Sequence, residues 1–233
     1  TSLLRGVTGS GKTNIYLTLT AKALAEQKSA ILLVPEIALT SQLVKIFSQT
    51  FGERVILIHS GQTLAERRKI WLQINETTCV HDAAPCIVIG PRSALLAPIH
   101  NLGLIMIDEA HESAYFQENT PRYSTLRLAS FIAQHLKIPC IFGSATPNIV
   151  EYHLAKSKNS LIELSAKAKT TAIDPSVSIV DLKDRKNFTK NRYFSNQLLT
   201  EIQKNIQDNH QTLIFHNRRG SAPLTLRLAS PLP

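Results

Sequence analysis

The chain has 233 residues, enough for one complete lobe and part of a second, because single domains usually hold about 100 to 200 residues. Three cysteines are too few for a disulfide framework, no apolar run approaches the roughly 20 residues that span a bilayer, and no signal peptide opens the sequence, so we expect a cytoplasmic protein without a membrane partner. The net charge of +9 favours nucleic acid as a partner, with a merely solvated basic surface as the alternative.

Short runs rich in Ile, Leu and Val predict buried parallel strands, and the amphipathic stretches between them predict crossover helices. In chain order the predicted elements are a helix over 12–27, strands over 30–34 and 55–58, a helix over 64–74, and strands over 86–89, 104–107 and 140–142. Alternation of strands and helices is typical of an α/β fold with a doubly wound parallel sheet.

The first predicted helix follows a sequence that fits the P-loop pattern G-x-x-x-x-G-K-[ST] at every fixed position. Its residues are Gly6, Val7, Thr8, Gly9, Ser10, Gly11, Lys12 and Thr13. Glycines let the backbone N–H groups turn inward, and the helix N-terminus adds partial positive charge, so the loop would bind the phosphates of ATP. Lys12 would reach the β and γ phosphates, and the Thr13 hydroxyl would bind Mg²⁺. A flexible turn without a ligand is the alternative.

The strand predicted over 104–107 ends in Asp108-Glu109-Ala110-His111, the letters of a DEAH box. Two carboxylates thus emerge at the carboxyl edge of the sheet, where the ligands of open α/β sheets bind. Asp108 would hold Mg²⁺ through its water shell, and Glu109 would orient and deprotonate the attacking water. His111 completes the predicted catalytic set. The alternative is that these carboxylates only end a strand and begin a turn.

The strand predicted over 140–142 continues into Gly143, Ser144, Ala145, Thr146 and Pro147. This segment offers two hydroxyls at the same edge, where they could hydrogen-bond the DEAH box. By itself it also suits an ordinary turn. Beside the other two motifs, residues 144–146 predict an element that couples the nucleotide state to a bound strand, as Ser-Ala-Thr does in superfamily 2 helicases.

The composition shifts toward polar residues and lysine after about residue 160, which indicates a boundary between lobes. We predict an ATP-binding lobe at 1–160, a linker at 161–195, the start of a second lobe at 196–223 and an unmatched tail at 224–233. A helix over 196–207 and a strand over 212–215 would open the second lobe. Since that lobe is shorter than a self-sufficient domain of about 50 residues, we expect a truncated chain.

Together with segments 34–40, 92–95 and 217–220, these motifs resemble the PriA family, the primosomal protein N′. The resemblance covers residues 3 to about 223. It implies RecA-like lobes and an ATP-dependent 3′ to 5′ DNA helicase core that restarts replication at stalled forks in bacteria. It also implies single-stranded or forked DNA, primosome proteins and single-stranded DNA-binding protein as partners, with zinc ions only in a C-terminal region that this chain lacks.

The resemblance further implies a loop after the DEAH box that senses single-stranded DNA. Its predicted contacts are Tyr115, Phe116, Arg122 and Tyr123, with Arg92 as a phosphate contact. Residues 121 to 192 agree with a DNA partner, because twelve Lys and Arg against five Asp and Glu place +7 of the net charge there. The aromatic rings could instead pack within the lobe.

Two other functions stay open. Without the arginine finger that the family carries late in its second lobe, the chain could bind nucleotide or DNA without hydrolysing ATP. The second open function is a P-loop ATPase unrelated to nucleic acid, such as a transporter subunit. Transporter subunits carry the signature Leu-Ser-Gly-Gly-Gln close before the Asp strand. Here only Ser60-Gly61-Gln62 matches part of that signature, and it ends 46 residues before Asp108.

Overall fold

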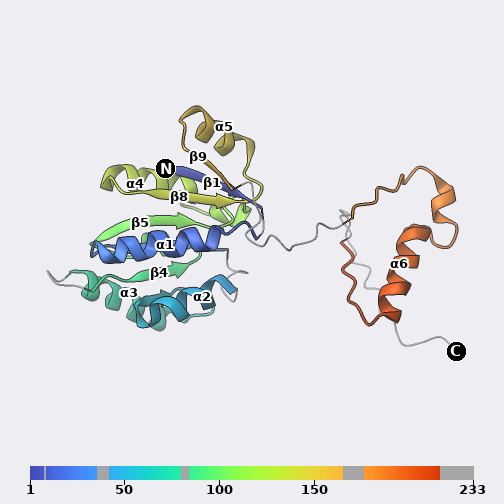
Figure 1. The fold of residues 1–233 in the computed structure, drawn as a ribbon. Helices are drawn as coiled ribbons and strands as arrows, with labels where there is room; N and C mark the ends of the chain where they lie inside the picture. Colours follow the sequence, from blue (N-terminus) through green and yellow to red (C-terminus); the bar gives the residue numbers. More distant parts are fainter. Residues whose placement is uncertain (8, 36–41, 80–83, 165–175, 216–233) are drawn as a thin grey trace. The chain divides into compact units, whose positions relative to one another are not determined.

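The computed structural model describes residues 1–7, 9–35, 42–79, 84–164 and 176–215, and the chain divides into two units, Thr1–Ala172 and Ile173–Pro233. The first unit is built on a seven-stranded sheet flanked by helices (Figure 1). The strands follow one another in the order β3-β4-β2-β5-β8-β1-β9, and every neighbouring pair is parallel.

The elements of the sheet and its connections have the following bounds. The strands are β1 (Ser2–Gly6), β2 (Ser29–Leu33), β3 (Val55–Leu57), β4 (Ile87–Gly90), β5 (Leu102–Ile107), β8 (Cys140–Ser144) and β9 (Leu161–Leu164). The helices are α1 (Lys12–Ala25), α2 (Gln42–Phe51), α3 (Leu64–Cys79), α4 (Thr125–Leu136) and α5 (Ile149–Ser157). A small antiparallel hairpin, β6 (Phe116–Gln117) and β7 (Tyr123–Ser124), lies between β5 and α4 in the sequence.

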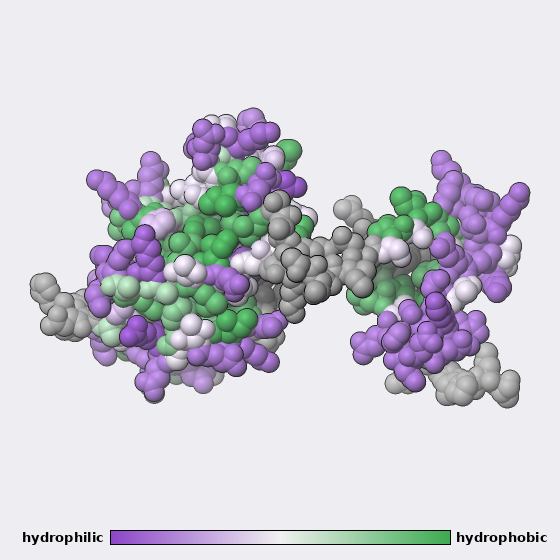
Figure 2. All heavy atoms as spheres, viewed as in Figure 1, coloured by the Kyte–Doolittle hydropathy of each residue, from purple (hydrophilic) through white to green (hydrophobic). Residues whose placement is uncertain are grey.

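The sheet has a hydrophobic core on each face, because successive strand residues point to opposite sides. On β1, Leu3 belongs to the core beneath α3, α4 and α5, whereas Leu4 belongs to the core beneath α1 and α2. All five residues of the central strand β2 are buried. Figure 2 shows one face of the first unit, on which hydrophilic residues lie mainly around the rim and hydrophobic residues are visible across the middle. Helices on both faces of a parallel sheet confirm the predicted α/β fold of the RecA-like type.

The order of the strands brings the three sequence motifs together. Strands β5, β8 and β1 are neighbours, and the chain leaves their carboxyl ends at Asp108, Ser144 and Gly6 respectively. Parallel strands end at a common edge, so a P-loop, a DEAH box and a Gly-Ser-Ala-Thr segment that lie far apart in the sequence share one edge of the sheet.

Three features of the first unit differ from the sequence prediction. Helix α3 extends past residue 74 to Cys79, and the Thr78 hydroxyl donates to the Ile74 carbonyl at 2.8 Å within this extra turn. Helix α1 ends at Ala25, two residues before the end predicted at residue 27, and Gln27 has a left-handed backbone at φ +56°. Strand β9 pairs with β1 inside the stretch interpreted as a linker, so the sheet extends past residue 160.

The second unit contains the predicted helix over 196–207, which is confirmed as α6 (Asn196–Gln207). Ser195 caps it by accepting a hydrogen bond from Leu198 N at 3.2 Å. The strand predicted over 212–215 is not formed, since no described residue pairs with it and the Leu213 and Phe215 side chains are exposed. The division into two helicase lobes stays a prediction. None of the helices in the described ranges has the length and apolarity to cross a bilayer.

Candidate active site

The P-loop has the backbone conformation that its glycines allow. Gly9 and Gly11 have φ values of +79° and +91°, in the left-handed region that side chains other than glycine rarely adopt. Gly11 is the N-cap of α1 and offers no side-chain cap, which leaves the amides of the first turn available to a ligand. Ser10 Oγ is buried and has no hydrogen-bond partner among the described residues. These features fit a loop that binds an anion through N–H and O–H donors.

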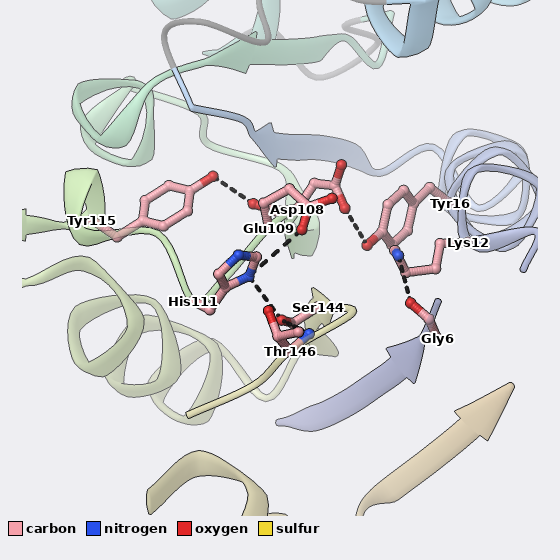
Figure 3. Close-up of polar contacts among 9 residues, drawn as sticks. All are labelled: Gly6, Lys12, Tyr16, Asp108, Glu109, His111, Tyr115, Ser144 and Thr146. Carbon is pink, nitrogen blue, oxygen red and sulfur yellow. Dashed lines mark hydrogen bonds and ion pairs between the residues drawn. The ribbon is translucent and has the colours of Figure 1, made fainter. Parts of the chain in front are cut away.

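Lys12 bends back over this loop. Its Nζ donates to the Gly6 carbonyl at 2.7 Å (Figure 3). At Gly6 a Cβ would overlap Ser10 Oγ, so a larger residue there would displace that hydroxyl. Thr13 follows on the first turn of α1 and is half-buried, whereas Val7 is exposed. Thr8 lies outside the described residues, as do segments 36–40 and 217–220 of the family resemblance and the predicted tail.

Asp108 lies immediately after β5 and is held from two sides. Its backbone N–H donates to the Leu33 carbonyl at 2.9 Å, which extends the pairing of β5 with β2 by one residue. Its carboxylate Oδ1 accepts a hydrogen bond from the Tyr16 hydroxyl on α1, also at 2.9 Å. Burial, reinforced by the charge of Asp108, raises the pKa of Tyr16 well above its ordinary value. The phenol therefore stays protonated and acts as a donor.

Glu109 lies in the same edge, with a left-handed backbone at φ +45°. Burial and the charge of Asp108 raise the pKa of its carboxyl, while Lys12 and His111 oppose the shift. A carboxylate with a raised pKa is a better proton acceptor than a free one. The raised pKa thus suits the predicted role of Glu109 as the group that deprotonates water.

His111 connects the DEAH box to the end of β8. Its Nδ1 lies 3.5 Å from Glu109 Oε2 and 2.9 Å from Ser144 Oγ. The Thr146 backbone N–H donates to Ser144 Oγ at 3.1 Å, so this hydroxyl stands between the two motifs (Figure 3). The predicted contact between the Ser144 hydroxyl and the DEAH box is therefore present, whereas Thr146 contributes its amide. Ala145 is half-buried beside them, and coupling through residues 144–146 stays a prediction.

In the aromatic segment after the DEAH box, the structure contradicts one of the predicted DNA contacts. Tyr115 is only 2% exposed and its hydroxyl donates to the Asp108 carbonyl at 2.7 Å, so its ring has no free face for a base. Tyr115 instead positions the carboxyl end of β5 at Asp108. Phe116 is 52% exposed and can stack on a base. Arg122 donates to the Glu118 carbonyl at 2.9 Å and is exposed, and Tyr123 is half-buried on β7. These three stay candidate contacts.

Arg92 holds the same segment in place. Its Nη1 donates to the carbonyls of Ala114 and Phe116, at 3.0 and 3.1 Å. The structure thus gives this guanidinium a positioning role that the sequence did not indicate, and its phosphate contact stays a prediction. A cationic donor shared by two carbonyls of one short segment restricts the backbone on both sides of Tyr115.

Replacing Arg92 by alanine is expected to loosen residues 113–118. Loss of the hydrogen bonds from a charged donor, about 1.5 kcal/mol, should speed local hydrogen exchange about tenfold. Hydrogen–deuterium exchange with mass spectrometry measures this, with Arg68→Ala on the exposed side of α3 as the matched control. Unchanged protection of residues 113–118 in the Arg92 variant would show that the two hydrogen bonds do not hold the segment.

The sequence does not indicate the contact of Tyr16 or the space that Gly143 leaves for it. Tyr16 lies one helical turn after Lys12 and so faces the same way on α1, which is the one signal that could have found it. Gly143 accepts a hydrogen bond from Ala110 N at 2.9 Å through its carbonyl. A Cβ at this position would overlap the Tyr16 hydroxyl, so the contact with Asp108 needs glycine there.

Comparison with known proteins agrees with this site. The DEAD/DEAH box helicase family matches residues 2–154. The replication restart protein PriA of Bacillus subtilis is 41% identical over 220 residues, which are 94% of this chain and 26% of that protein. PriA of Chlamydia trachomatis is 39% identical over 222 residues, 94% of this chain and 29% of that protein.

Among solved structures, the helicase domain of Hef from Pyrococcus furiosus has a TM-score of 0.49 at 21% identity, and the match covers 69% of this chain and 34% of that one. The chain spans 26% to 29% of the length of the two curated relatives above. The resemblance to PriA is confirmed by these relatives, and the matched range contains the P-loop, the DEAH box and the Gly-Ser-Ala-Thr segment. The chain belongs to the DEAD/DEAH box helicase family.

Proposed function

We propose that this chain is the ATP-binding and ATP-hydrolysing part of a DNA helicase. The observation that carries the proposal is the meeting of Lys12, at the start of α1, with Asp108 and Glu109, directly after β5, at one edge of the sheet. A phosphate-binding lysine beside two carboxylates is the arrangement that phosphoryl transfer to water needs. Relatives named replication restart protein PriA support the same function.

The P-loop fits the phosphates of ATP. Among the described residues, the Ser10 hydroxyl has no hydrogen-bond partner and the N-cap of α1 offers no side-chain acceptor, and phosphate oxygens would supply acceptors. The Lys12 ammonium, which now donates to the Gly6 carbonyl, would transfer to the β and γ phosphates. The same lysine therefore neutralises charge on the nucleotide and leaves the loop free to close around it.

The oxygen donors at this edge fit Mg²⁺, which prefers hard oxygen ligands. The Thr13 hydroxyl would bind the ion directly, and the Asp108 carboxylate would bind it through water. The ion would supply positive charge that offsets the negative charge built up on the phosphates during transfer. Glu109 accepts the proton of the attacking water, and His111 holds Glu109 toward Ser144.

Single-stranded or forked DNA is the proposed binding partner of the chain. Phe116 supplies an exposed ring, and the basic side chains between residues 121 and 192 supply phosphate contacts. For the whole protein we propose 3′ to 5′ unwinding in replication restart at stalled forks, in the bacterial cytoplasm. Primosome proteins and single-stranded DNA-binding protein are its proposed partners, and zinc ions are proposed only for the part of the relatives that this chain does not match.

Phosphate release from ATP, measured with the 233-residue chain and increasing single-stranded DNA, tests this function. We expect turnover that rises with DNA and does not rise with heparin, a polyanion without bases that controls for charge alone. Turnover indifferent to DNA would favour a P-loop ATPase unrelated to nucleic acid. ATP binding without turnover would favour a lobe that holds nucleotide but does not hydrolyse it.

A further inference from the structure

Tyr16 lies beneath the active site as part of the core. Its side chain is 0% exposed and belongs to the cluster between α1, α2 and the sheet. Its hydroxyl reaches out of that cluster to Asp108 Oδ1 at 2.9 Å, a contact across 92 positions of the sequence. The same helix carries Lys12 and Thr13 in its first turn, so one rigid element bears the phosphate-binding groups and the hydroxyl that holds the carboxylate (Figure 3).

The residues around the contact between Tyr16 and Asp108 leave a space that fits the hydroxyl of an aromatic ring. Gly143 leaves the space that the phenol oxygen fills, since a Cβ there would overlap that oxygen and would lie 3.4 Å from Asp108 Oδ1. Helix α1, the end of β5 and the end of β8 thus meet at the phenol. Because the hydrogen bond engages Oδ1, the second carboxylate oxygen is left to face the water shell of a metal ion.

We propose that Tyr16 is a positioning residue for Mg²⁺, which fixes the Asp108 carboxylate relative to Thr13 so that both can serve the same ion. The inference rests on the proposed function, because it assumes that Mg²⁺ and ATP bind at this edge. Groups that hydrogen-bond a metal-ligating carboxylate orient it, and their removal typically weakens metal binding about 10-fold to 100-fold. Tyr16 therefore acts through Asp108 and does not touch the nucleotide.

The test measures how much Mg²⁺ the 233-residue chain needs to bind a fluorescent ATP analogue. Tyr16→Phe keeps the buried ring and removes only the hydroxyl. We expect it to raise the Mg²⁺ concentration for half-maximal binding at least about tenfold, while binding of the analogue in EDTA is unchanged because the P-loop and Lys12 are intact. Thr20→Val is the matched control, since it also removes a buried hydroxyl from α1, but one that contacts Met106 Sδ and not Asp108. Its Mg²⁺ requirement should stay within about twofold of the wild type.

A second pair of variants separates positioning from packing. In an Asp108→Asn background, removal of the Tyr16 hydroxyl should not raise the Mg²⁺ requirement further, because the ligand that it orients is gone. Gly143→Ala, which displaces the phenol and leaves its hydroxyl intact, should reproduce the Tyr16→Phe effect and serves if that variant does not fold.

An unchanged Mg²⁺ requirement in Tyr16→Phe would overturn the inference. So would an equal loss of binding with and without Mg²⁺, since that pattern indicates a role in packing alone. If the wild-type chain fails to bind the analogue under any condition, the proposed function itself is wrong. That result differs from the first two, in which the wild type binds normally.

Discussion

Replacing Glu109 by glutamine should lower ATP turnover about 10²-fold to 10⁴-fold while ATP binding is retained. Glutamine has nearly the same shape but cannot accept the proton of the attacking water. The wild-type carboxyl is suited to the task, because burial and Asp108 raise its pKa and make it a stronger base than free glutamate. Steady-state phosphate release and equilibrium binding of ATP, measured on the same preparations, separate the two effects.

Glu118→Gln is the matched control for this substitution, since Glu118 is exposed and, among the described residues, its hydrogen bond with Arg122 uses the backbone carbonyl and not the carboxylate. It should keep the turnover of the wild type. A Glu109→Gln chain that releases phosphate at nearly the wild-type rate would mean that another group activates water. His111 would then be the next candidate, because its Nδ1 lies 3.5 Å from Glu109 Oε2.

Removal of the Lys12 side chain should weaken ATP binding about 10²-fold, which corresponds to the loss of charge-assisted hydrogen bonds of about 3 kcal/mol. The fold itself should survive, since Lys12 makes one described hydrogen bond, to the Gly6 carbonyl. Isothermal titration calorimetry of Lys12→Ala with ATP and Mg²⁺ measures the loss directly.

Lys22→Ala provides the comparison for Lys12→Ala, because Lys22 lies in the last turn of the same helix, away from the P-loop. It removes the same charge from α1 and should bind ATP as tightly as the wild type. Equal dissociation constants for Lys12→Ala and the wild type would mean that the phosphates do not bind at the P-loop. Equal weakening in both lysine variants would point to net charge as the cause.

The fold was predictable where burial gives a clear pattern. Strand β2 is buried along its whole length and appears in the sequence as one apolar run, and α6 begins with a serine cap and keeps a helical period. The edge strand β9 alternates only partly and follows a polar stretch, so the sequence predicts a linker there. Hairpin β6–β7 has two residues in each strand, too few for any periodic pattern.

The sequence predicts the motif residues of the site better than the residues that hold those motifs in position. Spacing alone identified Lys12, Asp108 and Glu109, because the chemistry requires those side chains at those positions. The Tyr16 contact depends on how α1 packs over β5, and no local pattern encodes that register. The prediction of Tyr115 as a DNA contact is wrong because a sequence does not show whether an aromatic ring faces solvent or the core.

We expect ATP and Mg²⁺ to bind between the P-loop and the DEAH box, and a crystal structure of the chain with Mg²⁺ and a non-hydrolysable ATP analogue would show whether they do. The β-phosphate should lie within residues 6–13, Lys12 Nζ should move from the Gly6 carbonyl to the phosphates, and the ion should lie between Thr13 and Asp108. An analogue bound elsewhere, with Lys12 still donating to Gly6, would contradict this expectation.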